Sequence, residues 1–203
     1  EAERIKKAVD IAGILGASCL RHDATWGIKG TGCRTYRDAI RLIVPAIRGV
    51  TEYAACSGIR TMTENHGYLL QESRRMEELV LAVDRPNYGL LVDIGNFMCA
   101  DESSLAALPT VMPYAFHVHA KDFLWKSGVE ARPDDSWFPT RGGNYLRGTI
   151  LGHGAVPLSQ CLAFITGSGY TGDISLEFEG SEDPLDAARR GFEFLKARCP
   201  TEV

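Results

Sequence analysis

Four side chains of the kinds that bind metal ions each end a separate short apolar run. The runs cover residues 59–64, 88–93, 114–119 and 173–177, and a helix-like or loop segment follows each of them. Apolar runs of this length are typical of buried β-strands. If the strands are parallel, their carboxyl ends meet at one edge of the sheet, as they do at the mouth of a β/α barrel. The pattern therefore predicts a shared site for Glu64, Asp93, His119 and Glu177.

Helical patterns alternate with these runs. Apolar residues fall at helical spacing over 5–15, 36–57, 73–83, 103–108, 158–165 and from Asp183 onward, and residues 17–20 predict one more strand. We expect Gly16 to end the first helix and Ser73 to cap the third. Strands that alternate with helices indicate the α/β class, with a parallel sheet covered by helices.

The number of strands predicts an incomplete barrel. Five strands can be counted, whereas a closed barrel has eight, so we expect the first three strands to be absent from this chain. An open sheet has two unpaired edges, which a homo-oligomer would cover.

Composition favours one soluble domain over residues 1–203, since 45% of the residues are hydrophobic and 24% are charged. A net charge of -4 argues against a nucleic-acid partner, which needs clustered lysine and arginine. No apolar stretch approaches the roughly 18 residues that span a bilayer, so no membrane partner is expected. The six cysteines form no CxxC pair and are interpreted as reduced thiols in a cytoplasmic protein.

Several motifs carry a family resemblance. They are Glu64-Asn-His-Gly, Gly89-Leu-Leu-Val-Asp-Ile-Gly-Asn, His117-Val-His-Ala-Lys-Asp, Gly152-His-Gly-Ala-Val-Pro and the stretch 169–180. In this order the chain resembles the sugar phosphate isomerase/epimerase family of xylose isomerase-like TIM barrels, from the fourth strand to the eighth. The resemblance implies one divalent metal ion (Mn, Mg, Co or Zn) held by the four side chains named above. It also implies that Glu64 and Glu177 act as acid and base.

Such a site predicts a metal-dependent isomerase or epimerase of a ketose or related hydroxy-carbonyl sugar. A hard cation can polarise the carbonyl and stabilise the enediolate that forms when the neighbouring carbon loses its proton. Lys121 shares the face of His119 and is expected to steady an oxyanion or a phosphate. His66 and Asn96 are expected to bind substrate hydroxyls, although several ketose epimerases of this superfamily have histidine where Asn96 stands.

The long segment 123–150 is expected to be a lid loop. In it, Trp137 would exclude water and Arg141 would meet an anionic group of the substrate.

The sequence is compatible with alternatives on four points. A keto-inositol-type dehydratase would use the same metal site, and a truncated barrel could bind a ligand or partner without turnover. Glu179 competes with Glu177 as the fourth ligand, because strand alternation turns both side chains inward. Arg21 and Asp23 lie near the mouth only if the first strand ends there.

Overall fold

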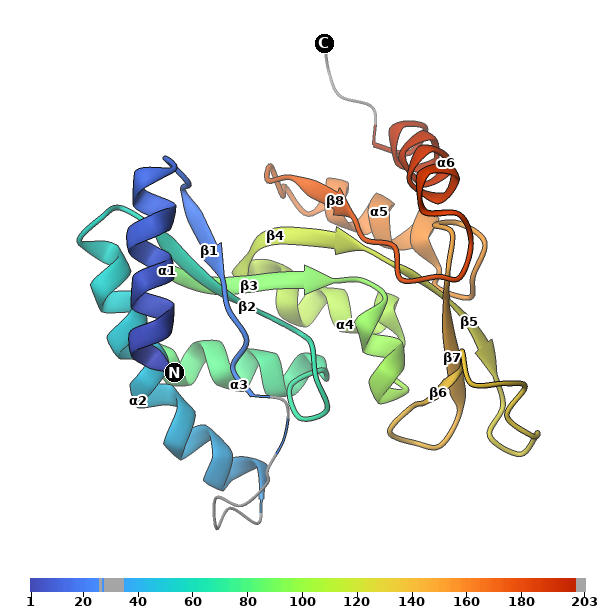
Figure 1. The fold of residues 1–203 in the computed structure, drawn as a ribbon, viewed down its shortest axis with the longest axis horizontal. Helices are drawn as coiled ribbons and strands as arrows, with labels where there is room; N and C mark the ends of the chain where they lie inside the picture. The colour runs from blue at the N-terminus through green and yellow to red at the C-terminus, as the bar shows by residue number, and fades with distance from the viewer. Residues whose placement is uncertain (26, 28–34, 200–203) are drawn as a thin grey trace. The chain divides into compact units, whose positions relative to one another are not determined.

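The computed structural model describes residues 1–25, 27 and 35–199, and its strands and helices alternate as predicted (Figure 1). In chain order the elements are α1 (Ala2–Ile14), β1 (Cys19–Arg21), α2 (Tyr36–Ala55), β2 (Arg60–Glu64), α3 (Ser73–Val83), β3 (Tyr88–Asp93), the 3-10 helix η1 (Asn96–Ala100), α4 (Ser104–Val111), the 3-10 helix η2 (Met112–Tyr114), β4 (Ala115–Ala120), β5 (Asp122–Lys126), β6 (Phe138–Pro139), β7 (Tyr145–Thr149), α5 (Leu158–Gly167), β8 (Ile174–Leu176) and α6 (Pro184–Lys196). Cys33 lies outside the described residues, and the other five cysteines are free thiols.

Five strands form one sheet in the order β1-β2-β3-β4-β8. The pairs β1–β2, β2–β3 and β4–β8 are parallel. A closed barrel of this class has eight strands, so the sheet confirms the prediction of an α/β fold that is an incomplete TIM barrel. Among the described residues, no helix is long and apolar enough to cross a bilayer.

The chain divides into two compact units. Unit 1 comprises Glu1–Leu91 and Tyr114–Phe116, and unit 2 comprises Val92–Pro113 and His117–Val203. Strands β3 and β4 contribute residues to both units. The single domain expected over residues 1–203 stays a prediction.

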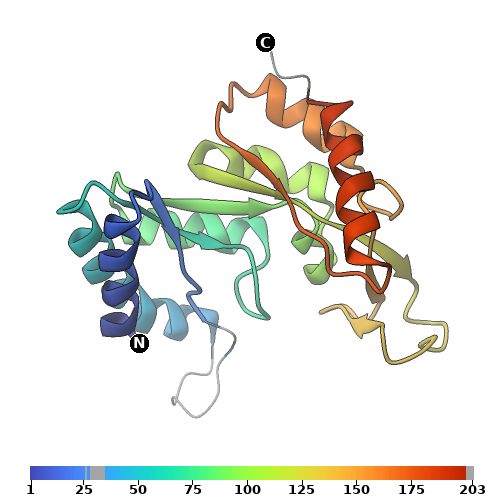
Figure 2. The ribbon, with the colours of Figure 1, turned by 45° about the horizontal axis from the view of Figure 1, so that its top comes forward.

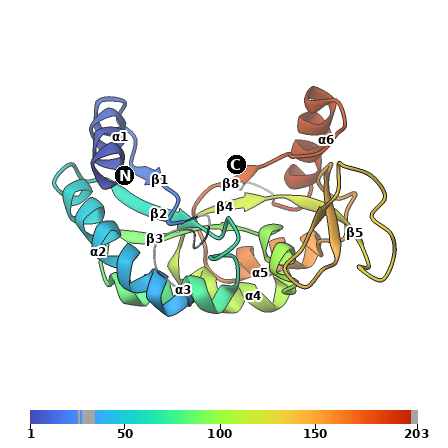
Figure 3. The ribbon, with the colours of Figure 1, turned by 60° about the horizontal axis from the view of Figure 1, so that its bottom comes forward.

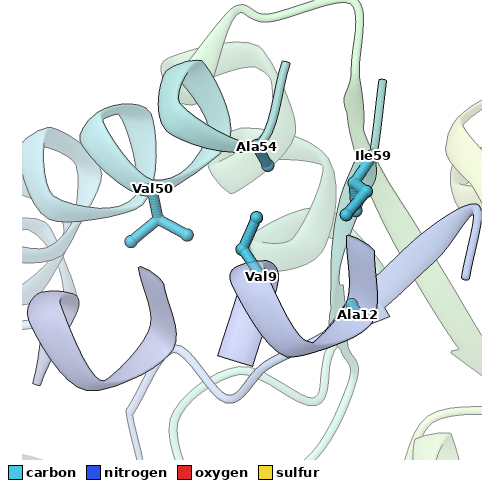
Figure 4. Packing of buried hydrophobic residues seen from close by; sticks show 5 residues of the cluster. All are labelled: Val9, Ala12, Val50, Ala54 and Ile59. Atoms are coloured by element: carbon cyan, nitrogen blue, oxygen red, sulfur yellow. The ribbon is translucent and has the colours of Figure 1, made fainter. Parts of the chain in front are cut away.

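Unit 1 is built around helix α2, which packs against α1 and α3. A cluster of buried side chains joins the two helices to the start of β2, and in Figure 4 Val9 points from α1 toward Val50 and Ala54 of α2. Ala12 and Ile59 complete the cluster. Burial of each larger aliphatic side chain stabilises the fold by about 1.5–3 kcal/mol. This cluster therefore holds α1 against α2.

The ends of the helices follow local chemistry, with one difference from the sequence analysis. Gly16 follows α1 with a φ of 70°, the left-handed conformation that ends a helix and favours glycine. Asp183 caps α6 by accepting a hydrogen bond from the backbone nitrogen of Asp186 at 2.8 Å. Ser73, expected as a cap, is instead the first residue of α3 because its side chain is buried, and Glu72 precedes the helix.

Unit 2 holds the last strands with their helices. Helix α6 packs against β8 (Figure 2), and α4 and α5 lie side by side (Figure 3). Gly191 lets α6 approach β8 closely, since a Cβ there would lie 2.1 Å from Cδ1 of Leu176 and that side chain would have to shift. Strand β8 ends at Leu176, one residue before the predicted end, so Glu177 directly follows the strand.

The segment 123–150 contains a second, antiparallel sheet of order β5-β7-β6. Its pairing joins Trp125 to Leu146 and Phe138 to the same Leu146. The segment is therefore a β-hairpin extended by a short third strand. The expectation that it acts as a lid stays a prediction.

Candidate metal centre

The four predicted ligand residues lie at the carboxyl ends of their strands. Glu64 is the last residue of β2, Asp93 the last of β3, and His119 the last but one of β4, whereas Glu177 directly follows β8. Each of them is an acidic or histidine side chain of the kind that could hold a metal ion.

Within unit 2, three of these side chains converge. Asp93, His119 and Glu177 each offer one ligand atom, and these atoms lie within 4.8 Å of one another. The parallel pairing of β4 with β8 explains the meeting, because the backbone nitrogen of Glu177 donates to the carbonyl oxygen of Ala120 at 3.0 Å. As a result Nδ1 of His119 lies 3.0 Å from Oε2 of Glu177.

Asp93 is held by the turn that follows it. Its Oδ1 accepts hydrogen bonds from the backbone nitrogens of Gly95 at 2.7 Å and Asn96 at 3.0 Å. Gly95 is required here, because a Cβ at this position would lie 2.8 Å from the carbonyl oxygen of Lys121. The carboxylate is fully buried, so its orientation is fixed by its own sequence neighbours.

Lys121 occupies the centre of the acidic groups. Its side chain is 1% exposed, and Nζ lies 3.4 Å from Oδ2 of Asp93, 3.0 Å from Oε2 of Glu177 and 3.1 Å from Oε2 of Glu179. Nζ also lies 3.4 Å from Oδ1 of Asn96. Burial alone would lower the pKa of Lys121, but the three carboxylates outweigh it and raise that pKa. The ammonium is therefore charged throughout the physiological range.

The surroundings of Glu177 differ from those of Glu179. Burial would raise the pKa of Glu177, yet the hydrogen bond with His119 and the charge of Lys121 hold it far below its usual range. Glu179 has a side chain 52% exposed and contacts Lys121. Glu177, not Glu179, belongs to the candidate group.

His117, on the same strand face as His119, is satisfied within the protein. Its Nε2 lies 2.8 Å from Oγ of Ser175, and its pKa is lowered by burial and by His119.

In unit 1, Glu64 has a partner that sequence reasoning left open. Strand β1 ends at Arg21, and the Arg21 guanidinium donates to Oε2 of Glu64 from Nε at 2.9 Å and from Nη2 at 2.6 Å. Nη2 also lies 2.9 Å from Oδ1 of Asp23, and Nδ1 of His66 lies 3.9 Å from that oxygen. Glu64 is only 4% exposed and His66 about a quarter exposed. Arg21 thus positions a predicted ligand, and it also contacts Asp23, which lies near His66.

Arg141 lies in the turn between β6 and β7. Its backbone nitrogen donates to the carbonyl oxygen of Cys99 at 2.9 Å. The turn is clamped by Asp101, whose carboxylate accepts hydrogen bonds from Thr140 at 2.7 Å, from Asn144 at 2.8 Å and from the backbone of Gly142. The position of Arg141 is therefore set by the end of η1.

The sequence matches the model of the xylose isomerase-like TIM barrel family over residues 1–198. The chain belongs to this family. It is 28% identical over 190 residues to YihM of Escherichia coli (strain K12), a protein described as uncharacterized, and the match covers 94% of this chain and 52% of that protein. The chain thus spans about half the length of this curated relative.

Two solved structures share the fold. A D-tagatose 3-epimerase-like protein superposes with a TM-score of 0.74 at 21% identity, over 97% of this chain and 67% of its own. A xylose isomerase-like TIM barrel protein from Mycobacterium smegmatis, determined in complex with magnesium, gives a TM-score of 0.71 at 20% identity, over 96% and 65%.

The donor set fits a hard divalent cation. Carboxylate oxygens and an imidazole nitrogen suit Mg²⁺, Mn²⁺, Co²⁺ or Zn²⁺. In unit 2 the carboxylates of Asp93, Glu177 and Glu179 surround one ammonium, that of Lys121. Three carboxylates against one ammonium leave an excess of negative charge, and carboxylates crowded together repel one another. A bound divalent ion would balance this charge.

Proposed function

We propose that this protein is a divalent-metal-dependent isomerase or epimerase of a ketose or related hydroxy-carbonyl sugar. The observation that carries the proposal is the convergence of Asp93, His119 and Glu177 around the buried ammonium of Lys121. Glu64 is the fourth ligand in this proposal. Its support is that it ends the strand paired with β3, in register with Leu91, and that its carboxylate is buried.

The four ligands would hold one ion, which when bound would polarise the carbonyl oxygen of the sugar. Lys121 would donate a hydrogen bond to the oxygen on which negative charge develops. Asp93 and Glu179 would keep its ammonium in place for this. Asn96, whose amide oxygen faces Lys121, would accept a hydrogen bond from a neighbouring substrate hydroxyl. His66 would bind a further hydroxyl, and Arg141 an anionic group where the substrate has one.

Proton transfer is assigned to Glu64 and Glu177. Both carboxylates are held by cationic or hydrogen-bonding partners, Arg21 for Glu64 and His119 with Lys121 for Glu177. For Glu177 these bonds keep the carboxylate ionised and able to accept a proton, but they also weaken it as a base. We infer that Glu177 exchanges its bond with Lys121 for contact with the substrate before it accepts the proton from carbon.

The descriptions of three similar structures support a reaction of this type. One similar structure is described as D-tagatose 3-epimerase-like, and another contains magnesium. A third, AsbF from Bacillus anthracis, is described as a probable 3-DHS dehydratase. Dehydration also begins with removal of a proton beside a carbonyl, so the reaction product distinguishes the two reactions.

The test is a scan of ketopentoses, ketohexoses and keto-inositols with the Mn²⁺-loaded protein, with products separated by chromatography. Epimerisation or isomerisation yields a sugar of the same mass, and Glu177→Gln should abolish it. A product lighter by one water, with new ultraviolet absorption, would replace the proposal with a dehydratase. Binding without any turnover would indicate a barrel that only holds its ligand.

A further inference from the structure

A hollow of about 370 Å³ lies in unit 2 beside the second sheet. It is bordered by η1, the first turn of α4, strand β5 and the residue that precedes α5. Its size is within the range of pockets that hold small molecules. We propose that this hollow, named here the Trp125 pocket, binds a neutral saccharide ring. Its lining residues are Met98, Asp101, Glu102, Ser103, Ser104, Trp125, Asn144, Ala155 and Pro157.

One wall of the pocket is aromatic. Trp125 is 48% exposed although it is the largest side chain of β5, whereas Phe123, two residues earlier on the same strand face, is 1% exposed. A tryptophan ring left half open beside a hollow offers an apolar surface with a negative face. The C–H face of a pyranose matches such a ring.

A second part of the pocket lining, at the start of α4, offers hydrogen-bond donors. Ser104 is 1% exposed, and among the described residues its Oγ has no hydrogen-bond partner. Ser103, the N-cap of α4, makes no side-chain cap hydrogen bond. The first turn of a helix carries backbone N–H groups without intrahelical partners. A ligand oxygen at this place would meet both the hydroxyl and these donors.

The rim excludes an anion. Asp101 and Glu102 border the pocket, and the hydrogen bonds from Asn144, Thr140 and Gly142 outweigh burial and lower the pKa of Asp101. Asp101 is therefore ionised near neutrality, and a phosphate or carboxylate would be repelled. A quaternary ammonium would suit the acidic rim and the indole but offers no acceptor to Ser104. A neutral polyhydroxyl ring offers acceptors, donors and an apolar face together.

The pocket is built before any ligand arrives. Asn144 donates to Asp101 at 2.8 Å and accepts from the backbone nitrogen of Gly128 at 3.0 Å, so its amide is fixed. The backbone nitrogen of Ala155 donates to the carbonyl oxygen of Phe123 at 2.7 Å, which ties the pocket floor to β5. Such preorganisation lowers the entropy cost of binding.

The test is a titration of the ¹⁵N-labelled protein with methyl β-D-glucopyranoside, followed by amide shifts and by tryptophan fluorescence. This probe has no free carbonyl, so the proposed isomerase reaction cannot consume it. We expect shifts at the amides of Ser103, Ser104 and Trp125, with a dissociation constant on the order of 1 mM. The shifts should persist in Glu177→Gln and in chelator, which separates this proposal from the proposed function.

Two variants and a matched control sharpen the result. Trp125→Ala should abolish binding, whereas Trp137→Phe, which changes a tryptophan of the same segment outside the pocket lining, should leave it unchanged. Ser104→Ala should weaken binding at least ~3-fold without lowering the melting temperature, because it removes a hydroxyl that has no partner in the protein. Absence of shifts at about 50 mM sugar, well above the expected constant, would overturn the proposal. So would shifts at the same amides with inorganic phosphate or tetramethylammonium in place of the sugar.

Discussion

Lys121 and Glu177 form an ion pair in which the buried Nζ lies 3.0 Å from Oε2 of the partly exposed carboxylate. His119 approaches the same oxygen at 3.0 Å through Nδ1. One carboxylate oxygen thus faces both a permanent cation and an imidazole nitrogen. Lys121 therefore balances the negative charge of the site when no metal is bound. In the metal-loaded site it is the candidate donor of a hydrogen bond to the oxyanion of the substrate.

Replacing Lys121 with methionine should destabilise the metal-free protein by about 3 kcal/mol, because it leaves the fully buried carboxylate of Asp93 without its cation. Folding raises the pKa of Lys121 above its unfolded value, so its contribution is complete below about pH 10 and is lost only as pH rises through the folded pKa. Urea unfolding in chelator at pH 7 measures the change.

Lys126→Met is the matched control for that variant. Lys126 pairs with Glu130 at 3.6 Å on the surface, so its loss should change stability by less than about 1 kcal/mol. Saturating Mn²⁺ should narrow the gap between wild type and Lys121→Met, since the ion replaces the missing positive charge. Equal stability of Lys121→Met and wild type in chelator would contradict the ion-pair account.

Asp101→Ala should release the turn between β6 and β7. The variant loses hydrogen bonds from Thr140, Gly142 and Asn144, each contributing about 1 kcal/mol. Amide hydrogen exchange should accelerate at Gly142 and Asn144, whereas Asp134→Ala, in the same segment, should affect only Ser136, its hydrogen-bond partner. Unchanged protection of the turn in Asp101→Ala would show that the clamp is not needed.

The hydrogen bonds between Asp101 and this turn should be lost at acid pH. The pKa of Asp101 is lowered on folding because hydrogen bonds from Asn144, Thr140 and Gly142 outweigh burial. Its stabilisation is therefore full above the unfolded value of about 4 and is lost as pH falls through the folded pKa. Hydrogen exchange of the turn, corrected for intrinsic rates, should show protection falling below about pH 4 in wild type and no such step in Asp101→Ala.

Asp122→Asn should destabilise the fold by about 2–4 kcal/mol. The carboxylate of Asp122 is 1% exposed and accepts four backbone hydrogen bonds, from Phe123, Gly152, Gly154 and Val156. An amide has one oxygen and would set a donor against two of these nitrogens. Thermal unfolding measures the effect, with the exposed Asp173→Asn as control, and a melting temperature equal to wild type would contradict it.

Much of the fold could be predicted because each strand of the parallel sheet is a short apolar run that a polar residue ends. This local pattern located Asp93 and His119 at the carboxyl ends of β3 and β4. Strand alternation also put Lys121 on the face of His119. Its burial among three carboxylates depends on β3 and on the segment after β8, and no local pattern encodes that contact.

The features that were missed are non-local. Arg21 meets Glu64 across 43 positions of sequence, and only the parallel pairing of β1 with β2 brings them together. The hairpin inside segment 123–150 pairs Trp125 with Leu146 across a long connection that carries turn residues and charges. The prediction that Ser73 caps α3 was wrong, because burial of its side chain outweighed the preference of serine for the cap position.

The central claim is that Glu177 holds a divalent ion together with Asp93 and His119. The measurement is metal content by inductively coupled plasma mass spectrometry after Mn²⁺ loading and gel filtration, for wild type, Glu177→Gln and the control Glu179→Gln. We predict about one ion per chain in wild type and in Glu179→Gln, and at least ~10-fold weaker retention in Glu177→Gln. A wild-type chain that retains no ion when Mn²⁺ is supplied, or a Glu177→Gln chain that retains as much as wild type, would contradict the account.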